Sequence, residues 1–240
     1  MPMLTKAEIK RIRSLGDKAG RQAEGLFAAE GEKLVGELLA SGLAVRGVYR
    51  TGENVTAAEM GRISFLKTPT PVLAVAEIPS FPAAEPGDGG LCLALDDVQD
   101  PGNVGTIIRL ADWFGVRDVY CSPATADCWS PKVVQATMGA VLRVRVHYAP
   151  LAPLLGRAVA AGMPVYGTFL EGDNIYRCDL APDRGIVVMG NEGRGISAEV
   201  AACVSHKLYI PPYPPAAGPT SESLNVAMAT AVALSEFRRR

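Results

Sequence analysis

Short apolar runs alternate with amphipathic segments from residue 91 to the end of the chain. The apolar runs are predicted to be strands, and the segments whose apolar residues recur every three or four positions are predicted to be helices. We expect strands near residues 91–95, 117–121, 142–147, 164–168, 185–189 and 207–211. We expect helices near residues 103–115, 131–139, 151–161, 196–203 and 223–238. This alternation favours an α/β fold with a largely parallel sheet covered on both faces.

A less regular pattern occupies the first 80 residues. Helical periodicity is predicted for residues 6–14 and 30–41, and strands for residues 44–50, 62–66 and 71–78. The stretch "SFPAAEPGDGG" that follows is rich in Pro, Ala and Gly, which is typical of a linker. We therefore expect a small α/β domain over 1–80, a linker over 81–90 and a larger domain over 91–240.

Three polar loops follow predicted strands of the larger domain. They are "DDVQDPGN" (96–103), "GNEGRG" (190–195) and "PPYPPAAGPTSES" (211–223). In parallel sheets, ligands bind at the carboxyl ends of the strands, in the loops that lead to the next helix. The loops match neither a P-loop nor the glycine fingerprint of a dinucleotide-binding dehydrogenase. Backbone N–H and C=O groups that glycines leave exposed, together with apolar walls, suit a small ligand that carries an adenine.

Composition narrows the class of protein. The chain has 240 residues, two histidines and five cysteines without a CxxC pair, so neither a metal site nor a disulfide framework is expected. No apolar run reaches the roughly 18 residues that span a membrane, and the charged N-terminus does not resemble a secretory signal. We expect a cytoplasmic protein with no membrane contact.

The N-terminal segment is basic although the net charge of the chain is only −1. Six basic residues stand against two acidic ones between residues 6 and 21. Such a segment can contact RNA phosphates, although a solvated helix face explains the charge equally well. The candidates for RNA binding are Lys10, Arg11, Arg13, Lys18 and Arg21.

The polar loops resemble the motifs of a known enzyme family. "LDDVQDPGNVGTIIRLADWFGV", "VVMGNEGRGIS" and "SESLNVAMATAVAL" are similar, in order and spacing, to the three motifs of the SpoU (TrmH) branch of the SPOUT RNA methyltransferases. "WSPKVVQATMGAVLRV" resembles the segment usual between the first two motifs, so the likeness covers residues 91–237. "FAAEGEKLVGELLASG" resembles the small substrate-binding domain, similar to ribosomal protein L30e, that often precedes this catalytic domain.

The resemblance implies a parallel-sheet catalytic domain with a C-terminal trefoil knot, preceded by a small α/β L30e-like domain. It implies a homodimer that binds S-adenosylmethionine and methylates a ribose 2′-hydroxyl in structured RNA. Ribosomal RNA is favoured as the substrate. A tRNA 2′-O-methyltransferase and a non-catalytic RNA-binding protein of the same fold are the alternatives.

The matched motifs also imply site residues. The expected catalytic set is Asn103, Arg109, Glu192, Ser223 and Asn225. The expected cofactor-binding set is Thr168, Phe169, Gly190, Asn191, Gly193, Ile210 and Leu224. Simpler structural roles compete with these assignments, because Asn103 and Ser223 stand where helix N-caps are expected and Glu192 could cap the helix predicted near Ser197.

Arg109 raises the question of catalytic chemistry. It falls away from the apolar face of its helix, so it is an exposed surface arginine, a partner of Asp112, or the catalytic arginine that the family resemblance implies. A guanidinium, whose pKa exceeds about 12, does not readily give up a proton. We therefore favour a cation that holds a phosphate and stabilises a developing 2′-alkoxide over a general base. Asp96 and Asp97 are expected to orient Arg109 or its dimer mate, or to cap the neighbouring turn.

The third loop departs from the family pattern. The segment between Pro211 and Glu222 is about twice the usual length and contains no Met. Because this loop normally packs along the cofactor, its length puts the affinity for S-adenosylmethionine in question. The same insertion is the main argument for the non-catalytic alternative, and the intact catalytic set argues against it.

Overall fold

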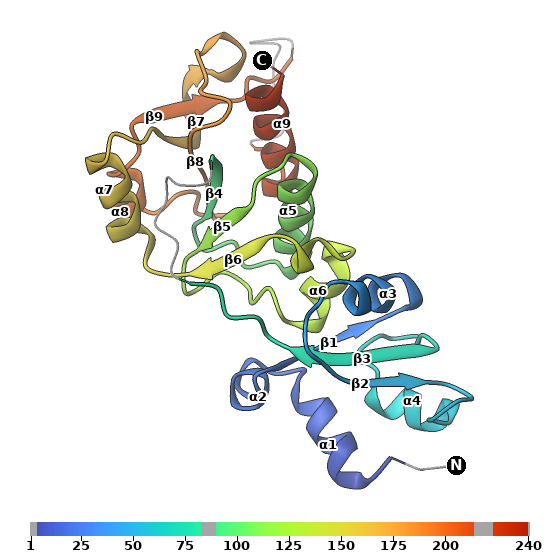
Figure 1. Ribbon diagram of the computed structural model, residues 1–240. Coiled ribbons are helices and arrows are strands. Elements are labelled where there is room, and N and C mark those ends of the chain that lie inside the picture. The colour runs from blue at the N-terminus through green and yellow to red at the C-terminus, as the bar shows by residue number, and fades with distance from the viewer. Residues whose placement is uncertain (1–3, 83–89, 214–222, 240) are drawn as a thin grey trace. The chain divides into compact units, whose positions relative to one another are not determined.

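The computed structural model describes residues 4–82, 90–213 and 223–239 (Figure 1). These residues form two compact units. The first contains the chain up to Ser80 together with Asp127–Leu142, and the second contains Phe81–Ala126 and the chain from Arg143 onward. The division after Ser80 coincides with the start of the expected linker, most of which, 83–89, lies outside the described residues. The inclusion of 127–142 in the first unit was not foreseen, since the sequence places this segment in the larger domain.

A three-stranded antiparallel sheet with the order β1-β3-β2 forms the centre of the first unit. Its strands are β1 (Leu26–Glu30), β2 (Val45–Arg50) and β3 (Val72–Glu77). Its helices are α1 (Lys6–Ser14), α2 (Lys18–Glu24), α3 (Glu32–Ala40), α4 (Ala57–Ile63), α6 (Pro131–Thr137) and the 3₁₀ helix η1 (Ala140–Leu142). Ile9 and Ile12, one turn apart on α1, are buried with Met60 and Ile63 of α4 in the core of this unit.

The predicted strand at residues 62–66 is wrong. Residues up to Ile63 belong to helix α4, which begins with a capping box. The Thr56 hydroxyl accepts a hydrogen bond from the Glu59 N–H, and the Glu59 carboxylate accepts one from the Thr56 N–H. The short apolar alternation of "RISFL" does not outweigh a helix whose first turn is satisfied in this way. Strand β1 and helix α2 were also not predicted.

The second unit contains a six-stranded sheet with the order β6-β5-β4-β8-β7-β9, in which every paired strand is parallel. Its strands are β4 (Leu91–Leu95), β5 (Asp118–Cys121), β6 (Arg145–Tyr148), β7 (Val165–Asn174), β8 (Gly185–Met189) and β9 (His206–Tyr209). Its helices are α5 (Pro101–Trp113), α7 (Leu151–Ala160), α8 (Ala198–Ala201), α9 (Val226–Arg238) and the 3₁₀ helix η2 (Ile175–Arg177). The predicted parallel α/β sheet is confirmed.

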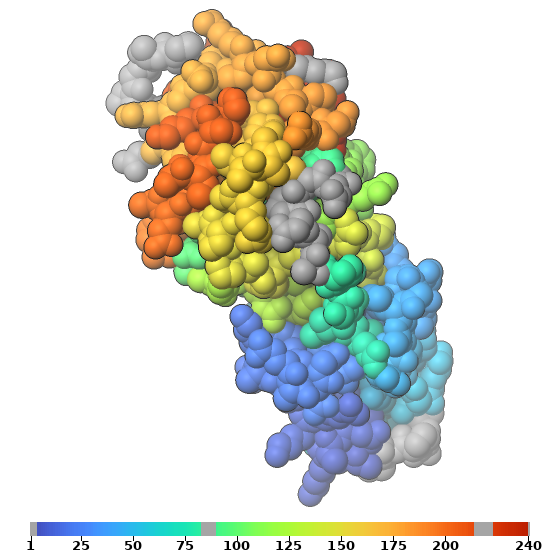
Figure 2. Space-filling model, turned by 60° about the vertical axis from the view of Figure 1, so that its left-hand side comes forward, coloured from blue at the N-terminus to red at the C-terminus, as the bar shows by residue number. Residues whose placement is uncertain are grey.

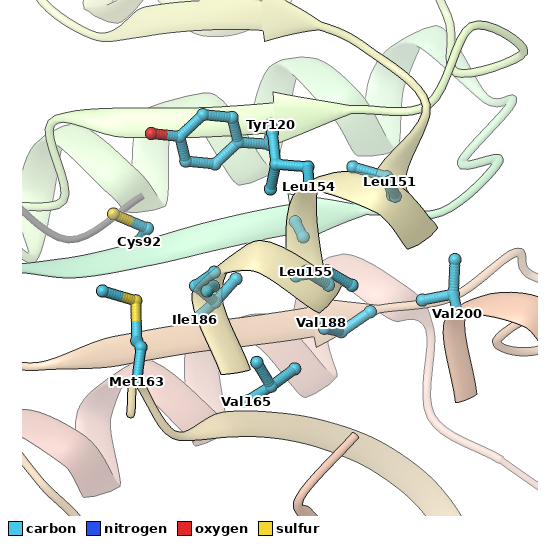
Figure 3. Close-up of a cluster of buried hydrophobic side chains, with 12 residues drawn as sticks. Cys92, Tyr120, Leu151, Leu154, Leu155, Met163, Val165, Ile186, Val188 and Val200 are labelled. Atoms are coloured by element: carbon cyan, nitrogen blue, oxygen red, sulfur yellow. The ribbon is translucent and has the colours of Figure 1, made fainter. Parts of the chain in front are cut away.

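Helices cover both faces of this sheet (Figure 1). Helices α7 and α8 pack together on one face, and α5 and α9 pack together on the other. Leu151, Leu154 and Leu155 of α7 are buried against Ile186 and Val188 of the central strand β8 (Figure 3). Strands β4 and β8 are buried along their whole length, as a parallel sheet covered on both faces requires. Among the described helices, none combines the length and the apolar character needed to cross a membrane.

The parallel register brings the expected site loops to one edge. Leu95 at the end of β4 is paired with Met189 at the end of β8. Strand β7 lies beside β8, and Thr168 on β7 is paired with Leu208 on β9. The loops that follow β4, β8, β7 and β9 therefore leave the sheet at the same carboxyl edge.

Candidate active site

Helix α5 begins in the first polar loop with Asp100 as its N-cap, so the Asn103 side chain is not used to cap the helix. The Asp100 side chain accepts a hydrogen bond from the Asn103 N–H over 2.9 Å, and Pro101 occupies the first helical position. The expected N-cap role of Asn103 is therefore wrong, because Asp100 fills it. The signal was present in the sequence as Asp followed by Pro, a pair typical of a helix start. The Asn103 amide is left to point into the second loop.

The second loop is a tight turn that Asn191 and the glycines shape. Asn191 and Gly195 exchange two backbone hydrogen bonds, and the Asn191 side chain accepts from the N–H groups of Gly193 and Arg194. A Cβ at Gly190 would overlap the backbone of Gly195, so glycine is required there. The Asn191 amide also donates to the Asp97 carbonyl over 2.8 Å, which joins the second loop to the first.

Glu192, at the tip of this turn, is the acceptor at the centre of the site. Its carboxylate accepts hydrogen bonds from the Gln99 N–H at 3.3 Å, the Asp100 N–H at 3.2 Å and the Asn103 Nδ2 at 2.9 Å. Burial raises the pKa of Glu192, but the hydrogen bonds from the Asn103 side chain and from backbone N–H groups outweigh it and lower the pKa overall. Glu192 is therefore an ionised acceptor at neutral pH.

The expected alternative, that Glu192 caps the helix near Ser197, is not what the structure contains. The N-cap of α8 is Ser197, and no side chain caps that helix end. The Ser197 N–H is bound instead by the carboxylate of Asp96, over 2.7 Å. Glu192 contacts the first loop.

Asn225 links the start of α9 to this network in a fixed direction. It is the N-cap of α9, and its Oδ1 accepts from the N–H groups of Ala227 and Met228. Its Nδ2 must therefore donate, and it does so to the Asn103 Oδ1 over 3.0 Å. This in turn fixes the Asn103 Nδ2 as the donor to Glu192. Three loops far apart in the sequence are thus joined by one directional relay.

Ser223 lies outside this relay. It is exposed at a bend before α9, and the expected N-cap role belongs to Asn225, two residues later. Both residues are short polar side chains suited to an N-cap, so the sequence alone does not separate them.

Arg109 is exposed on α5, six residues beyond Asn103, which corresponds to about 9 Å along a helix axis. Asp112, its expected alternative partner, forms an ion pair with Arg143 at 2.8 Å. Within the described residues, no hydrogen bond or ion pair of the Arg109 guanidinium is found. The relay brings together Asn103, Glu192 and Asn225, and Arg109 stands apart from them as an available cation.

Asp96 and Asp97 connect loops and do not orient Arg109. Asp97 has a left-handed backbone conformation with a φ of 57°, uncommon for a residue other than glycine. Its carboxylate accepts a hydrogen bond from the Ser122 hydroxyl at 2.6 Å and pairs with Arg194 at 3.4 Å. Asp96, as described above, holds Ser197. Ser122 and Arg194 were not anticipated, because their partner is distant in the sequence.

The expected cofactor residues lie within β7, in the segments that follow β8 and β9, and just before α9. Thr168, Phe169 and Ile210 are half-buried, and Leu224 is 52% exposed. A separate groove of about 440 Å³, lined by Tyr166, Leu208 and several polar residues that include Asp173 and Arg177, contains none of these expected cofactor residues. Apolar side chains beside glycine backbone fit the adenosine part of S-adenosylmethionine. Residues 214–222 of the third loop lie outside the described residues, so the effect of the loop's length remains a prediction.

The basic N-terminal segment contains both exposed and buried side chains. Lys10, Arg11, Arg13 and Lys18 are exposed on α1 and α2, the dark-blue part of the surface in Figure 2. Arg21 is 3% exposed. It donates to the Asp127 carboxylate at 3.0 Å and to the backbone carbonyls of Leu15 and Gly16. The expectation that Arg21 contacts RNA is corrected accordingly, since its guanidinium is used within the first unit.

Comparison with known proteins gives the family. The SpoU rRNA Methylase family matches residues 90–235, and the MRM3-like substrate binding domain matches residues 6–74. The Bacillus subtilis 23S rRNA (guanosine(2553)-2'-O)-methyltransferase RlmP is 29% identical to this chain, and the alignment covers 96% of each protein.

Solved structures agree with this family. One of them, from Porphyromonas gingivalis, is described as a candidate RNA methyltransferase of the TrmH family. It has a TM-score of 0.88 to this chain at 44% identity, and the match covers 99% of each chain. An AdoMet-bound rRNA methyltransferase from Sinorhizobium meliloti has a TM-score of 0.87 at 31% identity, covering 100% of this chain and 97% of that one. The family match spans more than half of the sequence and includes all three site loops. This chain therefore belongs to the SpoU rRNA methylase family.

Proposed function

We propose that this protein transfers a methyl group from S-adenosylmethionine to a ribose 2′-hydroxyl of ribosomal RNA. The observation that carries the proposal is the relay of Asn103, Glu192 and Asn225, which joins the three family motifs at the carboxyl edge of the sheet. The RlmP relative is named for this reaction on 23S rRNA, which favours ribosomal RNA over tRNA.

The relay residues act by positioning. Methyl transfer is a direct displacement, so the protein must align the attacking oxygen with the methyl carbon at near-attack distance. Asn103 is held by hydrogen bonds on both sides of its amide, and Glu192 stays ionised, so neither group needs to reorganise when RNA binds. Ser223, exposed beside Asn225, adds a hydroxyl that can orient the ribose.

Arg109 supplies a positive charge that acts on the RNA. A guanidinium is a positively charged group that donates hydrogen bonds and accepts none. It therefore holds an RNA phosphate and stabilises the negative charge that develops on the 2′-oxygen, and the proton leaves to a phosphate or to water. This agrees with an exposed cation that is not already committed to a partner in the described chain.

The proposed cofactor residues lie within β7, after β8 and β9, and before α9. Phe169, Ile210 and Leu224 hold the adenosine by apolar contact, beside Thr168, and the turn of Gly190, Asn191 and Gly193 contributes backbone groups. When bound, S-adenosylmethionine supplies an electrophilic methyl group. The side chain of Asn191 is already used to shape its turn, so its contribution to binding is through the backbone.

A homodimer is part of the proposal. Trp113, one turn beyond Arg109 on the same face of α5, is 83% exposed, and Met228 on α9 is 53% exposed. Exposed aromatic and methionine side chains are enriched at protein interfaces. The C-terminal knot implied by the family resemblance belongs to the same proposal.

The test is transfer of tritium from labelled S-adenosylmethionine to ribosomal RNA. Arg109→Ala is expected to abolish transfer while calorimetric affinity for the cofactor is kept, because the exposed guanidinium acts on RNA. Arg117→Ala, which changes another exposed arginine just beyond the same helix, is the matched control and is expected to retain activity. Wild-type protein that binds cofactor but labels no ribosomal RNA, while labelling tRNA, contradicts the proposed substrate.

A further inference from the structure

A groove of about 360 Å³ opens in the first unit, and none of the residues assigned above to catalysis or cofactor binding lines it. Strand β1, the segment after α4 and helix α6 all contribute to it. Its wall is largely apolar. The lining residues include Glu30, Phe65, Leu66, Pro131, Lys132 and Gln135. A groove of this size is large enough for a planar ligand.

Phe65 gives this groove an aromatic surface that is held in place. The Arg13 guanidinium lies over the ring, 4.9 Å from its centroid, and donates a hydrogen bond to the Ser64 carbonyl. The Phe65 N–H donates to the Glu30 carboxylate over 2.6 Å. Both the backbone and the ring of Phe65 are therefore fixed, so a stacking partner meets a preorganised surface.

Polar groups line the groove beside this ring. Glu30 is buried and accepts from the Ser64 hydroxyl and the Phe65 N–H, which leaves part of the capacity of a carboxylate for a further donor. Gln135 carries both a donor and an acceptor. The exposed Lys132 and Arg13 add positive charge. Unstacked RNA bases are recognised by this combination of aromatic stacking and edge hydrogen bonds, with cations for the adjoining phosphates.

We propose that this groove captures one unstacked nucleobase of the RNA substrate. The base stacks on Phe65, its polar edge meets Gln135 and Glu30, and Lys132 and Arg13 hold the flanking phosphates. The inference rests on the proposed RNA substrate and adds a second point of recognition, in the first unit. An apolar peptide is the less suitable occupant because Arg13 lies over the aromatic ring and Lys132 lines the groove.

The experiment is fluorescence anisotropy of the full chain with a labelled single-stranded RNA about 12 nucleotides long, and with the same RNA carrying abasic positions. Phe65→Leu keeps the apolar volume but removes the stacking surface, and it is expected to weaken binding of the base-containing RNA about tenfold. Its binding to abasic RNA is expected to equal that of the wild type. Gln135→Ala is expected to weaken binding in the same base-dependent way, whereas Gln22→Ala, an exposed glutamine outside the groove, has no effect.

Three outcomes overturn the proposal. One is unchanged affinity of Phe65→Leu for base-containing RNA, and another is an equal loss on both RNAs. The third is a changed oligomeric state with unchanged RNA affinity, which assigns the groove to a protein partner. Tritium transfer separates this proposal from the methyltransferase. Phe65→Leu protein as active as the wild type at limiting RNA contradicts only the groove, and base-dependent binding by protein that transfers no methyl contradicts only the reaction.

Discussion

Replacing Glu192 by Gln tests the central acceptor of the site with almost no change in shape. Three donors converge on the carboxylate, from Gln99, Asp100 and the Asn103 side chain. A glutamine offers one acceptor oxygen and an NH₂ group that would face donors. The Asn103 amide cannot flip to compensate, because its oxygen already accepts from Asn225.

The expected magnitude follows from these contacts. A hydrogen bond to a charged group contributes about 1.5–3 kcal/mol, and the exposure of Glu192 puts each bond here at or below the lower end. With one acceptor retained, the variant is expected to lose about 1–2 kcal/mol of unfolding free energy, or several degrees in Tm. A misplaced positioning group costs about a hundredfold in rate. We therefore expect methyl transfer to fall by roughly that factor with cofactor affinity largely kept.

The pH dependence gives an independent check. Because the folded-state pKa of Glu192 is lowered, its stabilising contribution is fully present above the unfolded-state pKa of about 4.3 and is lost as the pH falls through the folded-state pKa. Thermal unfolding of wild type and Glu192→Gln should differ at pH 7 and converge at low pH. Equal Tm and equal transfer rates at pH 7 would refute the role of Glu192 as an ionised hub.

Three further changes are expected to have distinct results. Asn103→Asp sets a second carboxylate opposite Glu192, so its methyl-transfer rate should fall below that of Asn103→Ala, and the reverse order would contradict the relay. Arg21→Ala leaves the Asp127 carboxylate without its buried partner and should cost about 3 kcal/mol in urea unfolding, whereas a loss below about 1 kcal/mol would contradict the anchor. Burial, with a smaller effect of a nearby carboxylate, raises the pKa of Cys92 to about 12, so its thiol should resist a disulfide reagent at pH 8 until the protein is unfolded, and rapid labelling of native protein at Cys92 would contradict its burial.

The parallel sheet could be predicted because its central strands are fully buried and its strands alternate with helices. The central strands β4 and β8 show as continuous apolar runs, and the loops at one edge follow from the parallel direction. The first unit was harder. Strand β1 is short and contains alanines, and α4 is decided by a capping box more than by its apolar pattern.

In the site, too, the sequence motifs identify residues, whereas the contacts between residues far apart in the sequence appear only in the folded structure. Asn103, Glu192 and Asn225 could be named from the motifs, but their order in the relay depends on pairs separated by 89 and 122 residues. The roles of Asp96 and Asp97 depend on Ser197 and Ser122, which only folding brings near. Arg21 was assigned a function that it does not have the exposure to perform. The basic pattern of the sequence does not reveal that this one arginine is buried in an ion pair with Asp127.

The most direct measurement of the central claim is the chemical position of the transferred methyl group. Ribosomal RNA labelled with tritium by the wild-type protein is hydrolysed in alkali, which needs a free 2′-hydroxyl to cleave the chain. The account predicts that the label remains in an alkali-resistant dinucleotide and is absent when Arg109→Ala protein is used. Label recovered in mononucleotides would place the methyl group on a base and contradict the account.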